Sequence, residues 1–232
     1  MSRGVAVGET PSGIGIFGGT FNPVHLGHLR AAEEVRERLR LERVLFVPAA
    51  DPPLKRGGDE PVAAATARLG WVRLAVRDNP YFAVDDCELG REGPSYSVDT
   101  LAQLGERHGR ERLVFLVGQD AFREMGSWRD PDRLLTLSHF AVITRPPAPE
   151  GTLADWLPPE LVSDLVLESG GDAARHRSAG TWIRRLDIGA LPISATDVRR
   201  RVREGRSLRY LLPEDVRQAV LASGAYAETP PS

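Results

Sequence analysis

Short runs of apolar residues alternate along the chain with longer segments in which apolar residues recur every third or fourth position. Ile14–Phe17 is a run of the first kind and ends at two glycines, and from Gly27 to Leu39 the helical spacing follows, with charged residues on the opposite face. A compact apolar run is typical of a buried strand, and a spacing of three to four is typical of a helix with one buried face. The first forty residues therefore predict a strand, a glycine-containing turn and a helix.

The same two patterns repeat to the end of the chain. Further strands are predicted at Val44–Val47, Tyr81–Val84, Leu113–Val117, Phe140–Ile143 and Trp182–Ile188. Further helices are predicted at 65–76, at Ser97–His108, around Glu160–Leu167, and from about Ala195 and Pro213. The segment 146–180 is rich in Pro, Gly and Ala, and within it Asp172–Arg177 is interpreted as disordered.

Strands that alternate with amphipathic helices predict an α/β fold. Parallel strands joined by helices are covered on both faces, and their crossovers are almost always right-handed. We therefore expect a single-domain, doubly wound, Rossmann-like and mostly parallel sheet with helices on both faces. The domain is expected to span 13–225, including C-terminal helices within 194–223, between a flexible tail at 1–12 and a second tail at 226–232.

The composition of the 232 residues, 41% hydrophobic and 27% charged, is that of a globular chain. Cys87 is the only cysteine, which excludes an internal disulfide and a four-cysteine zinc site and indicates a reducing, cytoplasmic compartment. Neither a signal peptide nor a membrane-spanning run is expected. A net charge of −2 gives no general attraction to nucleic acid. The expected partners are small molecules, for a monomer or a homodimer.

The turn after the first predicted strand carries the most distinctive chemistry. Residues 18–28 read GGTFNPVHLGH, which is neither the dinucleotide fingerprint nor the phosphate loop of the P-loop proteins. His25 and His28 are two of five histidines, and their side chains converge if the helix begins between them. A single histidine is usually structural. Two imidazoles beside helix-end amides, with no third ligand near in sequence, fit a phosphate chain better than zinc.

A second candidate lies near the C-terminus, at Ile193–Arg199. Ser194 is expected to cap a helix and Asp197 to complete a capping box, so a well-capped helix is one sufficient explanation. The same helix start also presents Thr196 and Arg199 to an anion. Of the three consecutive arginines that begin here, only Arg199 is expected to function, and the others to lie on the solvated surface.

These segments resemble the motifs of the nucleotidyltransferase superfamily. Residues 18–28 resemble its GxFxPxHxGH signature, and Ile193–Arg199 resembles ISSTxIR, with alanine in the third position. Three further segments resemble bacterial nicotinate-nucleotide adenylyltransferases: 53–55 (PLK) resembles PPHK, 95–101 (SYSVDTL) resembles SYTxDTL, and Gly118, Asp120 and Trp128 follow a GxD…W pattern. The resemblance covers the chain from about Ile14 to Val216.

The resemblance implies transfer of AMP from ATP to nicotinate mononucleotide, which yields deamido-NAD and pyrophosphate, and it assigns the site residues. Catalytic roles fall on His25, His28, Lys55 and Arg199. ATP contacts fall on Gly18, Gly19, Thr20, Phe21, Gly118, Asp120, Ser194, Thr196 and Arg199. Contacts to the nicotinate nucleotide fall on Lys55, Tyr96, Ser97, Trp128 and Arg145. No side chain is assigned to a metal, because Mg²⁺ is expected to bind through the ATP phosphates.

Several of these assignments have a structural alternative. Trp128 is placed against the pyridine ring, although a core tryptophan is equally consistent with the pattern. Ser97 is expected to be a helix N-cap whose helix-end amides help to bind the nicotinate carboxylate. Asp120 is expected to accept a hydrogen bond from a ribose hydroxyl, the alternative being a solvated loop residue. Lys55 is the only lysine among 30 basic residues, which makes its position in the PPHK-like segment notable.

The chain also departs from the family pattern. Leu54 replaces the usual histidine, which leaves the choice between the acid and the amide nucleotide open. Asn22 stands where aspartate is often found, a change expected to matter little. Besides a nicotinamide-mononucleotide or dual-specificity enzyme, the alternatives are pantetheine-phosphate adenylyltransferase, whose chains are shorter, and a non-catalytic nucleotide sensor. The complete set of charged motif residues counts against the sensor.

Overall fold

One continuous sheet organises the structure. The computed structural model describes residues 13–52, 61–144, 151–189 and 191–227, and within them eight strands are ordered β3-β2-β1-β4-β5-β8-β7-β6. The first six strands of this order are mutually parallel, and β7 and β6 continue the sheet in antiparallel pairing. The strands are β1 (Ile14–Gly19), β2 (Arg43–Pro48), β3 (Phe82–Val84), β4 (Leu113–Gly118), β5 (His139–Thr144), β6 (Leu165–Leu167), β7 (Ala173–His176) and β8 (Trp182–Asp187).

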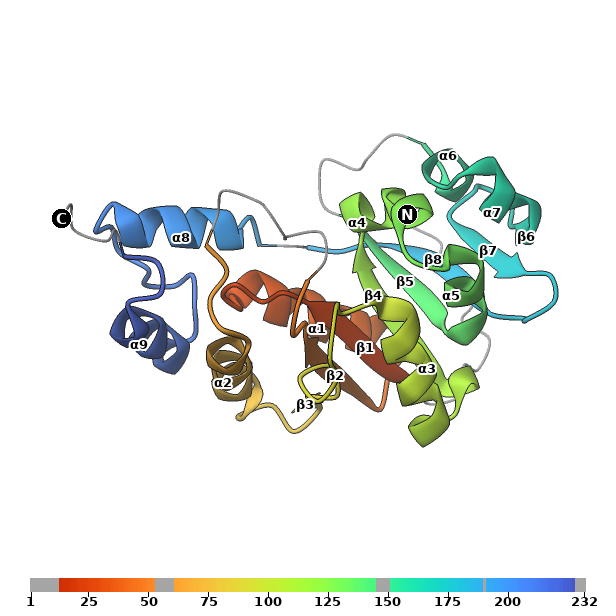
Figure 1. The fold of residues 1–232 in the computed structure, drawn as a ribbon. Coiled ribbons are helices and arrows are strands. Elements are labelled where there is room, and N and C mark those ends of the chain that lie inside the picture. Colours follow the sequence, from red (N-terminus) through yellow and green to blue (C-terminus); the bar gives the residue numbers. More distant parts are fainter. Residues whose placement is uncertain (1–12, 53–60, 145–150, 190, 228–232) are drawn as a thin grey trace.

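Helices cover both faces of this sheet, as the alternation along the sequence predicts (Figure 1). One face carries α1 (Leu26–Leu39), α2 (Ala65–Val76), α8 (Ala195–Arg203) and α9 (Glu214–Ser223). The other carries α3 (Ser97–His108), α4 (Gln119–Arg123), α5 (Pro131–Leu137), α6 (Leu153–Trp156) and α7 (Pro159–Ser163), and the short 3₁₀ helices are η2 (Arg110–Arg112) and η3 (Met125–Ser127). The longest described helix has 14 residues, and no helix of the described segments could cross a membrane.

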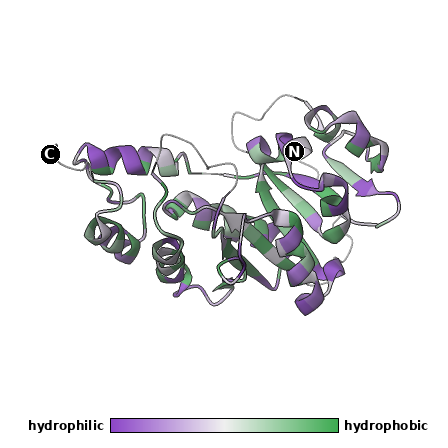
Figure 2. Ribbon diagram, in the orientation of Figure 1, coloured by the Kyte–Doolittle hydropathy of each residue, from purple (hydrophilic) through white to green (hydrophobic). Residues whose placement is uncertain are grey.

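The two faces bury alternate residues of the same strands. In β2, Val44 and Phe46 pack beneath α1 and α2, whereas Leu45 and Val47 pack beneath α3. A strand that is covered on both sides needs an apolar residue at every position, because successive side chains point to opposite faces. This explains the unbroken apolar runs of the sequence, which form the hydrophobic centre of the molecule in Figure 2. The prediction of a doubly wound, mostly parallel sheet is confirmed.

The prediction for 146–180 is wrong in two places. The helix predicted around Glu160–Leu167 ends at Ser163, and Leu165–Leu167 forms β6 instead. The segment interpreted as disordered contains β7, which pairs with β6 on one side and β8 on the other. Both strands are short, with three and four residues, which is too few to show a clear period. Local periodicity therefore could not indicate them. The short helices α4, α5 and α6 were not predicted for the same reason.

The C-terminal part of the chain returns to the first half. Figure 1 shows α8 and α9 at the same end of the molecule as α2, and the rings of Trp71 on α2 and Tyr226 lie 5.9 Å apart. Beyond β8, the Gly189 N–H donates to both carboxylate oxygens of Glu34 on α1, at 3.1 Å each. Tyr226, which the sequence assigns to the start of the second tail, is only 2% exposed. These contacts hold the segment after β8 against α1 and the end of the described chain against α2.

A half-buried histidine at the start of β5 predicts a pH dependence of stability. His139 stacks on Trp182 with ring centroids 4.6 Å apart, and its Nδ1 accepts a hydrogen bond from the Trp182 backbone N–H. Burial lowers the pKa of His139 from 6.5 to about 4. Between pH 4 and pH 6.5 the His139 imidazole is protonated in the unfolded chain and neutral in the folded chain. Its contribution to the free energy of unfolding is therefore complete above pH 6.5 and is lost as the pH falls toward 4.

Urea unfolding of the wild type and of His139→Gln at pH 7 and pH 5 measures this contribution. We expect the free energy of unfolding of the wild type to fall more steeply with acidification than that of the variant. Equal pH dependence in the two proteins would contradict the assignment.

Candidate active site

The turn between β1 and α1 brings the two predicted histidines together. His25 is the N-cap of α1, with extended backbone, and His28 is the third residue of the helix. The His25 backbone N–H donates to Nδ1 of His28 at 3.2 Å. The helix thus begins between the two residues, and this is the condition under which their side chains were expected to converge.

The two imidazole rings are stacked. Their centroids lie 3.6 Å apart with an interplanar angle of 25°, and His25 is only 4% exposed. The edges of Phe17 and Phe21 surround the ring of His28, with centroids 6.0 and 5.2 Å away. Because Nδ1 of His28 accepts a hydrogen bond, the ring carries its proton on Nε2, which can donate to an acceptor such as a phosphate oxygen. The arrangement is therefore suited to binding a negatively charged group.

Gly27 makes the stacking possible. A Cβ atom on this residue would lie 3.0 Å from Nδ1 of His25 and 3.3 Å from the carbonyl oxygen of Ile193. The side of α1 at this point is covered by the His25 ring and by the segment that leads into α8. Glycine is needed here for close approach, not for an unusual backbone angle. Gly27 is the last glycine of the GxFxPxHxGH-like segment, where no role was assigned to it.

Not every amide at the start of α1 is available to a ligand. The Leu26 N–H donates to the carbonyl oxygen of Leu211 at 2.9 Å, and the His28 N–H bonds back to the carbonyl oxygen of His25 at 2.9 Å. The expectation that the helix-end amides bind an anion therefore needs correction for these two groups. The loop before α9 uses one of them to hold the turn in place.

Arg199 reaches the same turn from α8. Its Nη1 donates to the main-chain carbonyl oxygen of Asn22 at 2.7 Å, and its Nη2 donates to Oγ1 of Thr196 at 3.1 Å. Burial lowers the pKa of the Arg199 guanidinium. Arg199 is 7% exposed, and the next arginine, Arg200, lies on the surface. Arg199 is thus the one buried residue of the three arginines, with Arg201 half-buried, and its role in function stays a prediction.

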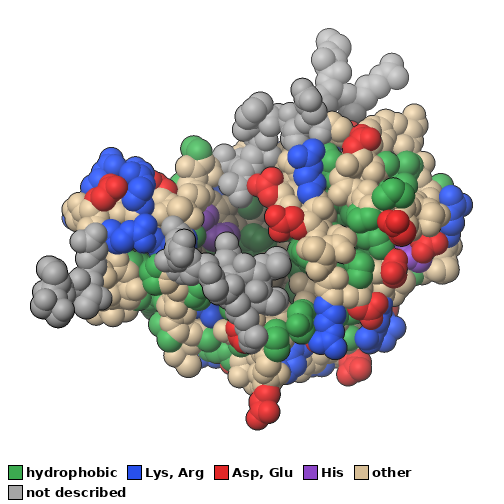
Figure 3. Space-filling view, turned by 45° about the horizontal axis from the view of Figure 1, so that its top comes forward, with side chains coloured by type: hydrophobic (Ala, Val, Ile, Leu, Met, Phe, Trp, Pro, Cys, Tyr) green, Lys and Arg blue, Asp and Glu red, His purple; other side chains and the backbone are tan. Residues whose placement is uncertain are grey.

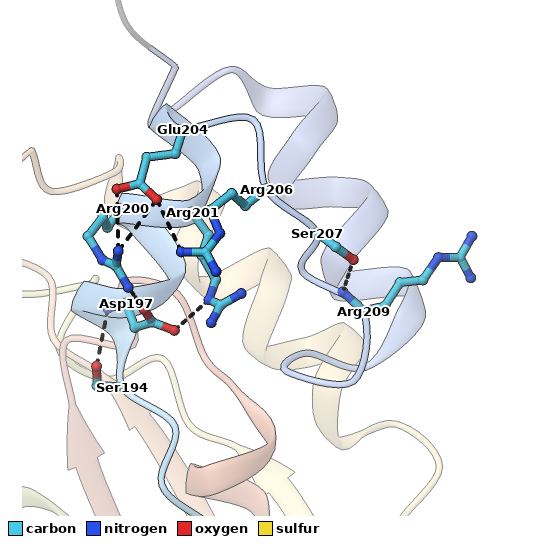
Figure 4. A network of polar contacts seen from close by, with 8 residues as sticks. All are labelled: Ser194, Asp197, Arg200, Arg201, Glu204, Arg206, Ser207 and Arg209. Carbon is cyan, nitrogen blue, oxygen red and sulfur yellow. Dashed lines mark hydrogen bonds and ion pairs between the residues drawn. The ribbon is translucent and has the colours of Figure 1, made fainter.

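The outer face of α8 is a closed network of ion pairs (Figure 4). The Asp197 N–H donates to Oγ of Ser194 at 3.1 Å, which confirms Ser194 as the N-cap. The Asp197 carboxylate, however, binds Arg200 and Arg201, and those contacts lower its pKa. The predicted capping box is therefore wrong in its second half, because nearby guanidinium groups compete successfully for the carboxylate.

Asn22 has a larger role than its assignment as a minor substitution suggests. It is 6% exposed, and its Nδ2 donates to the carbonyl oxygen of Pro61 at 2.9 Å. An aspartate carboxylate has no proton to donate to that carbonyl. The amide thus ties the β1–α1 turn to the segment before α2.

Two cavities open beside the histidine turn, at the carboxyl ends of the parallel strands. The larger has a volume of about 350 Å³ and is lined by residues 17–20, the end of β4, the start of α3 and Trp128. The smaller, of about 190 Å³, is lined by His25, His28, the start of α1 and the segment before α8. Phe17 and Gly118 line both cavities. The space-filling view shows this part of the surface hollowed, with histidine side chains beside the hollow (Figure 3).

The larger cavity collects residues predicted to bind the acceptor nucleotide. Tyr96, Ser97 and Trp128 all line it, and Trp128 stands with its ring at 78° to Phe115 and 6.3 Å away. The prediction of Ser97 as N-cap is wrong: Tyr96 has the extended backbone of the cap, and Ser97 is the first helical residue. The Ser95 hydroxyl accepts from the N–H groups of Ala50 and Asp51 and so fixes the segment before the helix.

Sequence reasoning missed two residues that shape this region. Arg68 on α2 is 1% exposed and donates to the carbonyl oxygens of Thr20, Ala50 and Ala63 at 2.7, 3.1 and 2.8 Å. The sequence indicates the burial of Arg68 only by its position, three residues after Ala65 on the apolar side of a predicted helix. Glu88 lines the larger cavity and accepts a hydrogen bond from the Thr100 hydroxyl at 2.6 Å, for which the sequence held no signal.

The remaining predicted residues are less closely gathered. Asp120 lies exposed in the first turn of α4 and lines neither cavity, and Ser194 and Thr196 are exposed at the start of α8. Lys55 and Arg145 lie outside the described residues. In the described part of the chain, no three His, Cys, Asp or Glu side chains form a group that could hold a metal ion.

Comparison with known proteins shows the family to which the chain belongs. Residues 16–201 match the model of the cytidylyltransferase-like family. The chain is 43% identical over 214 residues, 92% of its length, to a protein of Syntrophotalea carbinolica named as a nicotinate-nucleotide adenylyltransferase, of which the match covers 96%. A protein of the same name from Chromohalobacter salexigens is 43% identical over 218 residues, with 94% and 97% of the two chains covered.

The fold recurs in a solved structure of Plasmodium falciparum nicotinic acid mononucleotide adenylyltransferase complexed with NaAD. The TM-score is 0.69, with 93% of this chain and 97% of that chain covered. At 14% sequence identity, this similarity establishes the fold alone.

The contact between Gly27 and the His25 ring gives a specific prediction. Gly27→Ala should displace the ring and shift the imidazole NMR signals of His25 and His28, because the added methyl group has no room beside it. Gly70→Ala on α2 is the matched control, since a Cβ there meets nothing within 4 Å. The control should leave the histidine signals in place and raise stability by up to about 1 kcal/mol through helix propensity. Unchanged histidine signals in Gly27→Ala would contradict the geometry.

Proposed function

Because the chain belongs to the cytidylyltransferase-like family, and within it to the nicotinate-nucleotide adenylyltransferases, we propose that it transfers AMP from ATP to nicotinate mononucleotide, with deamido-NAD and pyrophosphate as products. The single observation that carries this proposal is the stacked pair of His25 and His28 between two cavities that share Phe17 and Gly118. Two nucleotides can occupy neighbouring cavities and meet at their phosphates only where the cavities join.

The reaction requires positioning and charge neutralisation more than covalent chemistry by the protein. The 5′-phosphate of the acceptor attacks the α-phosphorus of ATP in line, and pyrophosphate leaves. The imidazoles of His25 and His28, in the wall of the smaller cavity, neutralise charge that develops on the phosphate oxygens. Arg199 adds a guanidinium to the same turn, and Lys55 a flexible ammonium group. The adenosine half of ATP lies in the smaller cavity.

A protein nucleophile is not needed for this displacement. Burial raises the pKa of the Cys87 thiol to about 12, so the only cysteine stays protonated at neutral pH. Mg²⁺ is proposed to enter on the ATP phosphates and to supply positive charge there when bound. The donor set at the turn, imidazole and guanidinium rather than carboxylate, fits an ion held by phosphate oxygens and water.

The nicotinate nucleotide is placed in the larger cavity. Trp128 offers a ring face or edge to the pyridine, and Tyr96 and Ser97 begin α3 at the cavity wall. The start of a helix favours a negative charge, because its first N–H groups and its dipole point toward the ligand. This favours the carboxylate of nicotinate over the uncharged amide of nicotinamide. Leu54, which replaces the usual histidine, is the one feature that favours an amide-preferring or dual-specificity enzyme instead.

Pyrophosphate release with ATP and a panel of acceptors tests the proposed function. We expect turnover with nicotinate mononucleotide, a value of kcat/KM at least about tenfold lower with nicotinamide mononucleotide, and none with pantetheine phosphate. Equal use of the acid and the amide would indicate dual specificity. Absence of turnover with both pyridine nucleotides would refute the proposal.

His28→Ala tests the charge-neutralising role of the imidazole pair. We expect kcat to fall roughly a hundredfold or more, while ATP binding measured by calorimetry changes only a few fold. His108→Ala, a histidine in the last turn of α3 that lines neither cavity, is the matched control and should keep wild-type kcat. Undiminished turnover of His28→Ala would exclude the pair from catalysis.

A further inference from the structure

A tyrosine beyond the family-model match is bonded to the histidine turn from the far end of the chain. The Tyr226 hydroxyl donates to Oδ1 of Asn22 at 2.5 Å, across 204 positions of sequence. We propose that Tyr226 is a positioning residue for nucleotidyl transfer, which acts through Asn22 on the turn that carries His25 and His28. The inference rests on the proposed function, and it concerns a residue outside the matched segment 16–201.

The orientation of the Asn22 amide is fixed by main-chain groups of known polarity. The Ala63 N–H can only donate, and it lies 3.0 Å from Oδ1, whereas the Pro61 carbonyl can only accept, and it lies 2.9 Å from Nδ2. With the oxygen so assigned, the contact with Tyr226 is a hydrogen bond from the hydroxyl to the amide oxygen. Oδ1 therefore has two donors, one from the segment before α2 and one from the C-terminus.

The surroundings of Tyr226 keep its hydroxyl a donor. The side chain is 2% exposed, and its ring packs against Trp71 of α2 at 5.9 Å. Burial raises the pKa of Tyr226, although the nearby positive charges of Arg68 and Arg199 oppose this shift. The phenol is therefore protonated at neutral pH. A buried hydroxyl costs free energy unless it is hydrogen-bonded, and Asn22 supplies the acceptor.

The turn held in this way needs external support. Phe21 has a φ of 47°, in the left-handed region that is unfavourable for a residue with a Cβ atom, and its ring contacts His28 at 5.2 Å. Arg68 bonds the carbonyl oxygen of Thr20, on one side of Phe21, and Arg199 bonds that of Asn22, on the other. Tyr226 adds the contact that fixes the Asn22 side chain between them. A shift of Asn22 would pass directly to Phe21 and to the imidazole pair.

Tyr226→Phe tests the proposal because it removes only the hydroxyl. At a temperature well below the Tm of each protein, we expect kcat to fall about tenfold with less than a twofold change in either KM, since the cavities themselves are unchanged. Tyr210→Phe is the matched control, because that tyrosine precedes α9 on the same C-terminal segment and is 86% exposed. It should retain wild-type kcat.

A second variant separates positioning from stability. Asn22→Ala should lower kcat by itself, and Tyr226→Phe in that background should cause no further loss, because the two side chains act through one hydrogen bond. Additive losses, or a kcat of Tyr226→Phe within twofold of the wild type, would overturn the proposal. Loss of stability without loss of kcat would do the same.

Failure of the proposed function gives a different result. In that case neither the wild type nor Tyr210→Phe releases pyrophosphate with any acceptor. The positioning role is then read from the imidazole NMR signals of His25 and His28. These should shift in Tyr226→Phe and stay unchanged in Tyr210→Phe, and unshifted signals in Tyr226→Phe would overturn the inference.

Discussion

The site depends on how the turn between β1 and α1 is held. The turn leaves a parallel strand, passes through a residue with left-handed backbone and delivers two imidazoles to one stack. Its own hydrogen bonds do not suffice for this shape. Buried groups from α2, α8 and the C-terminus bond its carbonyl and amide groups instead. Because these groups are buried, each bond that is lost leaves an unsatisfied polar atom, which makes the turn stiff.

The same constraint shapes the charge around the site. Arg68 is buried and bonds three carbonyl oxygens, and among the described residues it forms no ion pair with a carboxylate. The carboxylates of Asp197 on α8 and of Glu204 just after it bind arginines of the same helix (Figure 4). The guanidinium groups of Arg68 and Arg199 thereby lie against the turn in a protein with a net charge of −2. A local field of this kind attracts polyanionic nucleotides without attraction to nucleic acid in general.

Local sequence identified the parts of the site that depend on local geometry. His25 and His28 are three apart, so any helix that begins between them brings their rings together. Ser194 caps α8 because its hydroxyl reaches the N–H three residues later. The partner of a side chain that can choose between several groups was not predictable in this way. Asp197 binds guanidinium groups in preference to the amide, and Tyr96 instead of Ser97 takes the cap of α3.

The sequence by itself determined the strand–helix alternation and the sheet covered on both faces, because these follow from periodicity. It also determined that the histidine turn lies at the carboxyl end of the first strand, because this follows from the turn residues. Only the tertiary structure decided the antiparallel extension by β6 and β7, the burial of Arg68 and the bond between Asn22 and Tyr226. β6 and β7 pair with near neighbours in sequence, and they escaped prediction because they have only three and four residues. The pairs Arg68–Thr20 and Asn22–Tyr226, by contrast, are 48 and 204 positions apart. Contacts across such separations are set by the packing of whole elements, which no local pattern encodes.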